Sequence, residues 1–148
     1  MRSVLRTVHA TAAVIAMAMI VAFLAVTLST LGGGAVADAG TSKAVVWYGV
    51  KWLVVALAAA GMTGKAMCRG RPGGLAAVKF RRMKIVAANG ILILVPCAYL
   101  LYARTQVAPV NGWYAALQIV EIAAGIVNLA LLAANMRDGL RMRARRIQ

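Results

Sequence analysis

The amino-acid sequence predicts an all-α fold, an integral membrane four-helix bundle with its N and C termini in the cytoplasm. The 148 residues are 63% hydrophobic and only 14% charged. Soluble domains typically have about 45–50% apolar and about 25% charged residues, so this composition excludes an ordinary soluble domain. Four apolar stretches divide the chain, and 14 of the 17 Lys and Arg residues, against 3 Asp and Glu in all, lie in three segments between and beyond them. These patterns predict four membrane spans and their orientation.

The chain is expected to form a single membrane domain, and its spans cover residues 10–31, 44–63, 85–103 and 113–136. Each is near the roughly 20 residues that a helix needs to cross about 30 Å of hydrocarbon. The first span carries no charge, and the second contains Lys51. The third is uncharged but holds Asn89 and Pro96, and the fourth holds Glu121. The runs lack the alternation of a barrel strand, so helices are predicted.

The N-terminus has a second interpretation. Arg2 and Arg6 precede the first apolar run, and 35–37 reads Ala-Val-Ala, which has the small-x-small form of a signal-peptide cleavage site. The run is about 20 residues long, whereas the apolar region of a signal peptide has about 7–15. We therefore expect a retained first helix.

Basic residues predict the orientation. Two lie before the first span, seven lie in the loop 64–84, and five lie in the tail 137–148, whereas the opposite side carries only Lys43 and Arg104. The positive-inside rule then predicts that both termini lie in the cytoplasm, and a bacterial-type inner membrane is the expected location. The same basic segments are expected to attract anionic lipid head groups, and nucleic acid is not an expected partner.

The connections and aromatic residues complete the layout. Residues 32–42 and 104–112 are expected to be outer turns, while Leu75 to Lys84 extends the third helix inward as a basic amphipathic stretch. Trp and Tyr favour the membrane–water interface, and all seven fall in the predicted outer half. They form an expected aromatic belt: Trp47, Tyr48, Trp52, Tyr99, Tyr102, Trp113 and Tyr114.

A polar seam runs along the fourth span. Its members recur at spacings of 4, 3, 4, 3, 4 and 3, which places them on one stripe of a helix. Amide and carboxyl groups are costly in lipid, so the stripe must face protein. Amides in such a seam are expected to hydrogen-bond neighbouring helices, and Asn89 in the third span joins them. The stripe comprises Tyr114, Gln118, Glu121, Gly125, Asn128, Leu132 and Asn135.

Glu121 is the only acid in any predicted span, and Lys51 is the only basic residue. Both lie roughly 10–12 Å beneath the outer surface when counted at about 1.5 Å per residue. An ionised carboxylate in hydrocarbon requires a partner or a proton, so an intramembrane Lys51–Glu121 pair is predicted. The pair is either structural or functional, and a third possibility is that Lys51 extends outward to water and leaves Glu121 protonated.

Pro96 lies at a similar depth in the third span. Proline donates no backbone hydrogen bond and displaces the carbonyl four residues earlier, so a helix kink with a freed Leu92 carbonyl is predicted. Cys97 is the neighbouring residue. A carboxylate, an ammonium, a carbonyl and a thiol are therefore expected to converge in the outer third of the bundle.

The residue inventory does not favour catalysis, a cofactor or a metal site. His9 is the only histidine, which rules out bis-histidine haem ligation within one chain. Two cysteines and one histidine at three different depths do not form a zinc site. No Gly-rich phosphate loop follows a strand. The protein is expected to be non-enzymatic.

Two function classes remain. The first is an accessory or scaffold subunit of a larger membrane complex, favoured by small size and spans rich in Ala and Gly. The alternative is a small proton- or cation-coupled transporter that uses Glu121 and Lys51. In length and span count the chain resembles the small multidrug resistance transporters. This resemblance implies a membrane-embedded glutamate in the first helix. Here 10–31 has no acid and Glu121 lies in the fourth span, so the resemblance extends to the layout alone.

Overall fold

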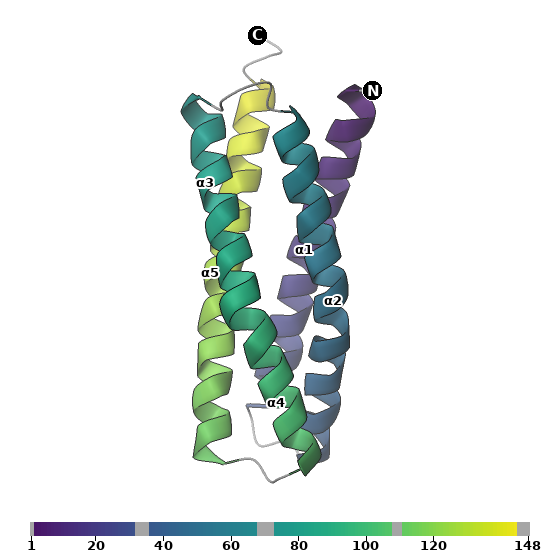
Figure 1. Cartoon of the computed structure of the whole chain (residues 1–148), viewed down its shortest axis with the longest axis vertical. Helices are drawn as coiled ribbons and strands as arrows, with labels where there is room; N and C mark the ends of the chain where they lie inside the picture. Colours follow the sequence, from purple (N-terminus) through teal and green to yellow (C-terminus); the bar gives the residue numbers. More distant parts are fainter. Residues whose placement is uncertain (1, 32–35, 68–72, 108–110, 145–148) are drawn as a thin grey trace.

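The structure, a computed structural model, describes residues 2–31, 36–67, 73–107 and 111–144. Figure 1 shows a bundle of long helices in which the start of the first helix and the end of the last helix lie at the same end. The elements in chain order are α1 (Arg2–Ser29), α2 (Val36–Met67), α3 (Gly74–Asn89), a π-helical segment η1 (Gly90–Leu94), α4 (Val95–Val107) and α5 (Gly112–Ala144).

Because α3, η1 and α4 follow one another without a break, the described residues form four helical rods. All four are long and apolar enough to cross a membrane. The predicted all-helical fold is therefore confirmed, and the length and hydropathy of its four rods suggest an integral membrane protein.

The helices extend well beyond the apolar stretches that predicted them. The expected outer turn 32–42 is wrong over most of its length, because α2 already begins at Val36. The predicted inward extension of the third helix over Leu75 to Lys84 is confirmed, since α3 begins at Gly74. Hydropathy detects the part of a helix that hydrocarbon surrounds, whereas backbone hydrogen bonding continues into the polar region at either end.

The rods are arranged so that α1 packs against α2 and α5, while the rod formed by α3, η1 and α4 closes the other side. This rod slants across the bundle (Figure 1). Its α3 part packs mainly against α5, near the end that holds the termini, and its α4 part packs mainly against α2 at the opposite end. Side chains from all four rods therefore meet in the centre.

The core is narrow, and small residues allow the helices to approach closely. A Cβ atom on Gly49 of α2 would lie 2.5 Å from Cζ of Phe23, and one on Gly125 of α5 would lie 3.0 Å from Cδ2 of Leu24. Both glycines thus leave room for large side chains of α1 to pack against their helices. Large apolar side chains elsewhere on all four rods are exposed, as expected for a surface in contact with lipid. The buried core cluster comprises Ala16, Ile20, Val50, Leu53, Val86 and Leu132.

The third rod is irregular immediately before the predicted kink at Pro96. Residues Gly90 to Leu94 form a π-helical turn, in which the Val95 N–H donates to the Gly90 carbonyl. Proline has no N–H and crowds the preceding turn, so a wider turn at this point accommodates its ring. Leu94 from this segment lines the central cavity described below.

Candidate polar site within the bundle

The seam of α5 faces the interior. All seven residues of the stripe from Tyr114 to Asn135 are buried, and Asn128 has no exposed surface at all. The stripe continues one step further, because Asp138 lies three residues beyond Asn135 and is also buried. Its polar side chains fall into three layers along the bundle, of which the first connects α5 to α1 and α2 and the other two connect it to α3.

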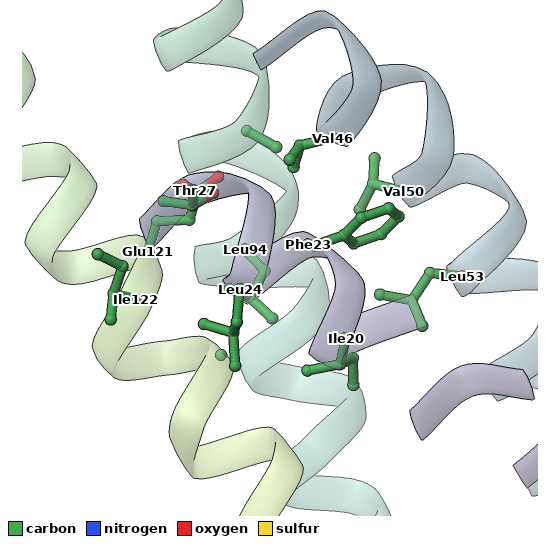
Figure 2. Close-up of a pocket in the computed structure, with 12 residues that line it drawn as sticks. Ile20, Phe23, Leu24, Thr27, Val46, Val50, Leu53, Leu94, Glu121 and Ile122 are labelled. Atoms are coloured by element: carbon green, nitrogen blue, oxygen red, sulfur yellow. The ribbon is translucent and has the colours of Figure 1, made fainter. Parts of the chain in front are cut away.

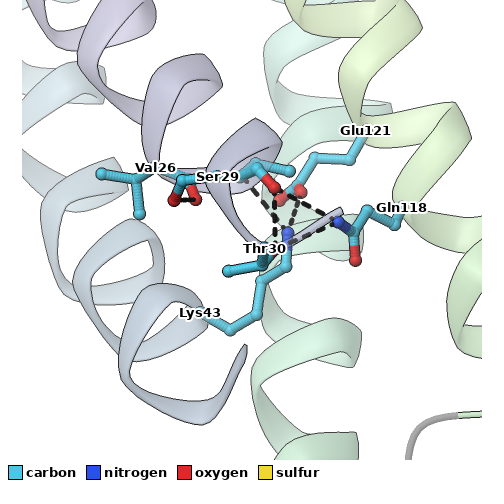
Figure 3. A network of polar contacts seen from close by, with 7 residues as sticks. Val26, Ser29, Thr30, Lys43, Gln118 and Glu121 are labelled. Carbon is cyan, nitrogen blue, oxygen red and sulfur yellow. Dashed lines mark hydrogen bonds and ion pairs between the residues drawn. The ribbon is translucent and has the colours of Figure 1, made fainter. Parts of the chain in front are cut away.

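The first layer, called the outer layer because it lies farthest from the end where α1 begins and α5 ends, is an ion pair between Glu121 of α5 and Lys43 of α2. The Lys43 ammonium donates to Oε2 of Glu121 and to Oγ1 of Thr27 on α1, the latter at 3.3 Å. The Lys43 side chain has no exposed surface and that of Glu121 is 8% exposed. One salt bridge therefore joins three helices in the middle of the bundle, and Figure 3 shows the lysine reaching across to the glutamate.

The predicted partner of Glu121 was wrong. Lys51 is exposed on the outside of α2, where its ammonium lies 5.3 Å from the ring centre of Trp47 and 5.1 Å from that of Tyr48. These cation–π contacts hold Lys51 on the outer surface. Depth was counted from a second helix that begins at residue 44, which left Lys43 outside the helix, whereas α2 begins at Val36.

A signal for Lys43 was present in the sequence. Buried residues of α2 recur at spacings of 4, 3, 4 and 3, and Lys43 belongs to that stripe while Lys51 does not. The same test that identified the seam of α5 would have identified Lys43 if the second helix had been extended outward. The stripe consists of Ala39, Lys43, Val46, Val50 and Leu53.

Amide and hydroxyl groups surround the ion pair. Gln118, one turn before Glu121, donates from Nε2 to the Thr27 carbonyl and to Oγ1 of Thr30, both at 3.4 Å. The Thr30 hydroxyl in turn donates to the Thr27 carbonyl at 2.7 Å. Figure 3 shows Gln118 and Thr30 on either side of the pair. The end of α1 is thereby tied to α5 and α2 by hydrogen bonds.

The middle layer joins α5 to the third rod through two asparagines. Nδ2 of Asn89 donates to Oδ1 of Asn128 at 2.8 Å and to the Ala124 carbonyl at 2.9 Å. Nδ2 of Asn128 donates to the Val86 carbonyl at 3.4 Å. Further along, Nδ2 of Asn135 donates to the carbonyl of Lys79 at 3.4 Å. The predicted seam amides thus bond to neighbouring helices within this chain.

The third layer lies at the end that holds the termini and was missed by sequence reasoning. Nη1 of Arg82 on α3 donates to Oδ2 of Asp138 on α5 at 2.6 Å. Arg137 lies on the other side of the carboxylate, with Nε 4.0 Å from Oδ1. Continuing the seam by three residues would have placed Asp138 on the buried stripe.

A cavity of about 40 Å³ lies beside the outer ion pair, between all four rods (Figure 2). Glu121 and Thr27 contribute the polar part of its wall. Oε1 of Glu121 and the Tyr114 hydroxyl have no hydrogen-bond partner within the described ranges. The Cys97 thiol, the neighbour of Pro96, is buried. The apolar part of the wall comes mainly from Ile20, Phe23, Leu24, Val46, Val50, Leu53, Leu94, Ala98 and Ile122.

The predicted aromatic belt is divided by the fold. Trp47 of α2 lies 5.2 Å from Tyr99 and 6.4 Å from Tyr102 of α4, measured between ring centres. Trp52 and Trp113 are 70% and 66% exposed. Tyr114 instead belongs to the buried seam and is 4% exposed. Most of the aromatic residues thus form an outer cluster, and one has an interior position.

Among residues 2–31, 36–67, 73–107 and 111–144, no group of three or more His, Cys, Asp or Glu side chains is placed to hold a metal ion. Fold and seam together define a class, a bundle of four helical rods long and apolar enough to cross a membrane, with a polar seam through an otherwise apolar core. Comparison with protein-family models, with curated proteins and with solved structures gave no match.

Proposed function

We propose that this chain is a non-enzymatic accessory or scaffold subunit of a larger membrane complex. The observation that supports this proposal is the enclosure of the outer ion pair. Lys43 neutralises Glu121 within the same chain, and both side chains are shielded from solvent. A buried pair of this kind suits a fixed connection between helices, because separating the charges leaves each one uncompensated in a low-dielectric interior.

The partners that suit this role are other membrane subunits or a second copy of the chain. The polar side chains of the seam are directed inward, so the exterior of the rods offers apolar surface to lipid and to neighbouring helices. We propose that the chain lies in a bacterial-type inner membrane with both termini on the cytoplasmic side, where its basic segments lie next to anionic lipid head groups. Nucleic acid is not among the proposed partners.

Co-purification tests the subunit role. An affinity-tagged chain extracted from native membranes in a mild detergent is expected to retain one or more different membrane proteins in a fixed ratio, identified by mass spectrometry after crosslinking. A matched sample with Lys43→Leu and Glu121→Leu together is expected to retain the same partners, because an apolar pair can replace a buried ion pair that is only structural. Recovery of the chain alone, or only as a homodimer, would count against the subunit role.

A small proton- or cation-coupled transporter is the second candidate, and one observation favours it. Oε1 of Glu121 has no hydrogen-bond partner within the described ranges, and this residue lines the central cavity together with Thr27. A carrier would need the carboxylate itself, so Glu121→Gln and the double leucine variant would both abolish transport. In vesicles that carry a pH gradient, wild-type protein would dissipate the gradient and both variants would not.

A further inference from the structure

Several basic residues from the first part of α3 and the last part of α5 lie near one carboxylate, that of Asp138. Asp138 is 6% exposed, and Arg82 binds it at 2.6 Å across the interface between the two helices. On α5 itself, Nε of Arg137 lies 4.0 Å from Oδ1 of Asp138, and Arg141 follows Asp138 by about one helical turn. Three arginines are therefore grouped near a single acid, which leaves an excess of positive charge at this place.

A fourth cation adds to the cluster. The Lys79 ammonium lies 3.0 Å from the position that a Cβ atom on Gly139 would occupy, so the lysine of α3 crosses α5 where a glycine leaves room for it. Lys79 lies about one turn before Arg82 on α3, and Gly139 follows Asp138 directly. The cluster thus spans the interface between α3 and α5, which Figure 1 shows side by side at the end where α1 begins and α5 ends.

Apolar side chains flank these cations on the outside of the same two helices. Val78 and Ile85 of α3 are 37% and 48% exposed, and Met136 and Leu140 of α5 are 43% and 61% exposed. A ligand that satisfies both features has an anionic head group and hydrocarbon chains. Guanidinium groups suit a phosphate because their N–H donors match its oxygens in pairs.

We propose that the interface between α3 and α5 at Asp138 is a binding site for the phosphate diester of an anionic membrane lipid. This interface, with Lys79, Arg82, Arg137 and Arg141 around Asp138, is called the groove below. In this site Asp138 holds the Arg82 guanidinium in place. The side chains of Arg137, which is 65% exposed, and of Arg141, which is also exposed, donate to the lipid phosphate. Basic pockets between transmembrane helices bind lipid head groups in this way. The proposal is independent of the subunit role, because any membrane protein can carry such a site.

The test removes two charges from the groove and compares this with the loss of two charges elsewhere. The variant Arg137→Gln with Arg141→Gln leaves the Arg82–Asp138 pair intact. Its control is Arg6→Gln with Lys65→Gln, which removes the same charge from exposed positions on α1 and α2. Binding of phosphatidylglycerol to each purified full-length chain is measured by native mass spectrometry in neutral detergent, with phosphatidylcholine as the reference lipid.

The groove variant is expected to bind phosphatidylglycerol roughly 10-fold or more weakly than wild type, since each basic residue near a membrane surface contributes appreciably to anionic lipid binding. The control is expected to stay within about 3-fold of wild type, and inorganic phosphate at millimolar concentration is expected not to compete, because it has no acyl chains. Equal weakening in both variants would identify a diffuse positive surface and overturn the proposal. Full competition by inorganic phosphate would overturn it as well.

Folding is followed in the same samples. Thermal unfolding midpoints of the two variants in detergent without added lipid are expected to match, because all four substituted side chains are exposed and both variants keep the Arg82–Asp138 pair. If the groove variant proves unstable, Arg141→Lys supplies the second measurement. Lysine keeps the charge but loses the paired donors, so it is expected to bind phosphatidylglycerol more weakly than wild type and more strongly than the double variant. Binding equal to that of the double variant would overturn the proposal.

Discussion

At the scale of single residues, the protein depends on how it accommodates charge in an apolar interior. Lys43 has no exposed surface, yet its ammonium has a carboxylate and a hydroxyl as partners. Burial of such a group is tolerated only when the partners satisfy it, because an isolated ammonium loses far more hydration energy than hydrocarbon contact returns. Lys51, eight residues along the same helix, meets the same requirement by remaining at the surface.

Removing one member of the ion pair should therefore destabilise the fold strongly. Lys43→Met and Glu121→Gln are each expected to lower the free energy of unfolding by about 3–5 kcal/mol, because each leaves a buried polar group without its partner. Lys43→Leu with Glu121→Leu is expected to recover most of that loss. Equilibrium unfolding in detergent micelles measures all three.

Lys51→Gln is the matched control, since it removes the same charge from an exposed position of α2. It is expected to change the free energy of unfolding by no more than about 1 kcal/mol, the scale of an exposed cation–π contact. A loss as large as that of Lys43→Met would mean that the wrong lysine has been assigned to Glu121.

At the scale of elements, close packing between helices depends on where small residues face a large neighbour. Gly49 faces the ring of Phe23, whereas Gly61 on the same helix has no atom within 4 Å of the position of its missing Cβ. Two glycines of the same helix therefore differ in whether they contact a neighbouring helix. The α1–α2 contact is the most extensive in the bundle, so a change at Gly49 affects its main interface.

Gly49→Ala is expected to destabilise the protein by about 1–3 kcal/mol, because its methyl group would overlap the Phe23 ring. Gly61→Ala is expected to be neutral or to stabilise by up to about 1 kcal/mol, since alanine favours the helix and meets open space. Both values come from unfolding in detergent. Phe23→Leu in the Gly49→Ala background should restore part of the stability, and no restoration would argue against this contact.

The asparagine layer makes a second prediction at this scale. Asn89→Ala is expected to cost about 1–2 kcal/mol, because it removes the donor to both Asn128 and the Ala124 carbonyl. Ile91→Ala, two residues away and 62% exposed, serves as the control and is expected to cost less. Equal costs would show that the Asn89 amide contributes no more than an exposed apolar side chain.

At the scale of the whole molecule, the four rods place the chain termini at one end together with the basic segments. Lys65 at the end of α2 and the Asp138 groove lie there, whereas Arg104 and the outer aromatic cluster belong to the opposite end. This division is the one that the positive-inside rule requires for a cytoplasmic location of both termini. Orientation is thus a property of the entire bundle and not of one helix.

Thiol labelling of intact cells tests the orientation. In a background with Cys68→Ala and Cys97→Ala, a membrane-impermeant maleimide is expected to label Val107→Cys and to leave Lys65→Cys unlabelled until the membrane is opened. Val107 is 79% exposed and Lys65 is exposed, so accessibility in the protein does not limit either reaction. The opposite pattern, or labelling of both positions, would contradict the proposed orientation.

The residues that define the seam were predictable, and their partners were not. Helical spacing alone placed Tyr114 through Asn135 on one stripe, because a helix has a fixed rotation per residue. Helix ends were less predictable, since hydropathy does not detect a helix that continues past the hydrocarbon. That error moved Lys43 into a loop and made Lys51 the apparent partner of Glu121.

The sequence by itself determined the four apolar rods, the side of α5 that must avoid lipid and the concentration of basic charge at one end. Each of these follows from local composition or from the period of a single helix. Only the tertiary structure decided that Lys43 pairs with Glu121, that Asn89 bonds to Asn128 and that Arg82 bonds to Asp138. Such pairings depend on which helices are neighbours and on their relative rotation, and these are set by packing between segments far apart in the chain.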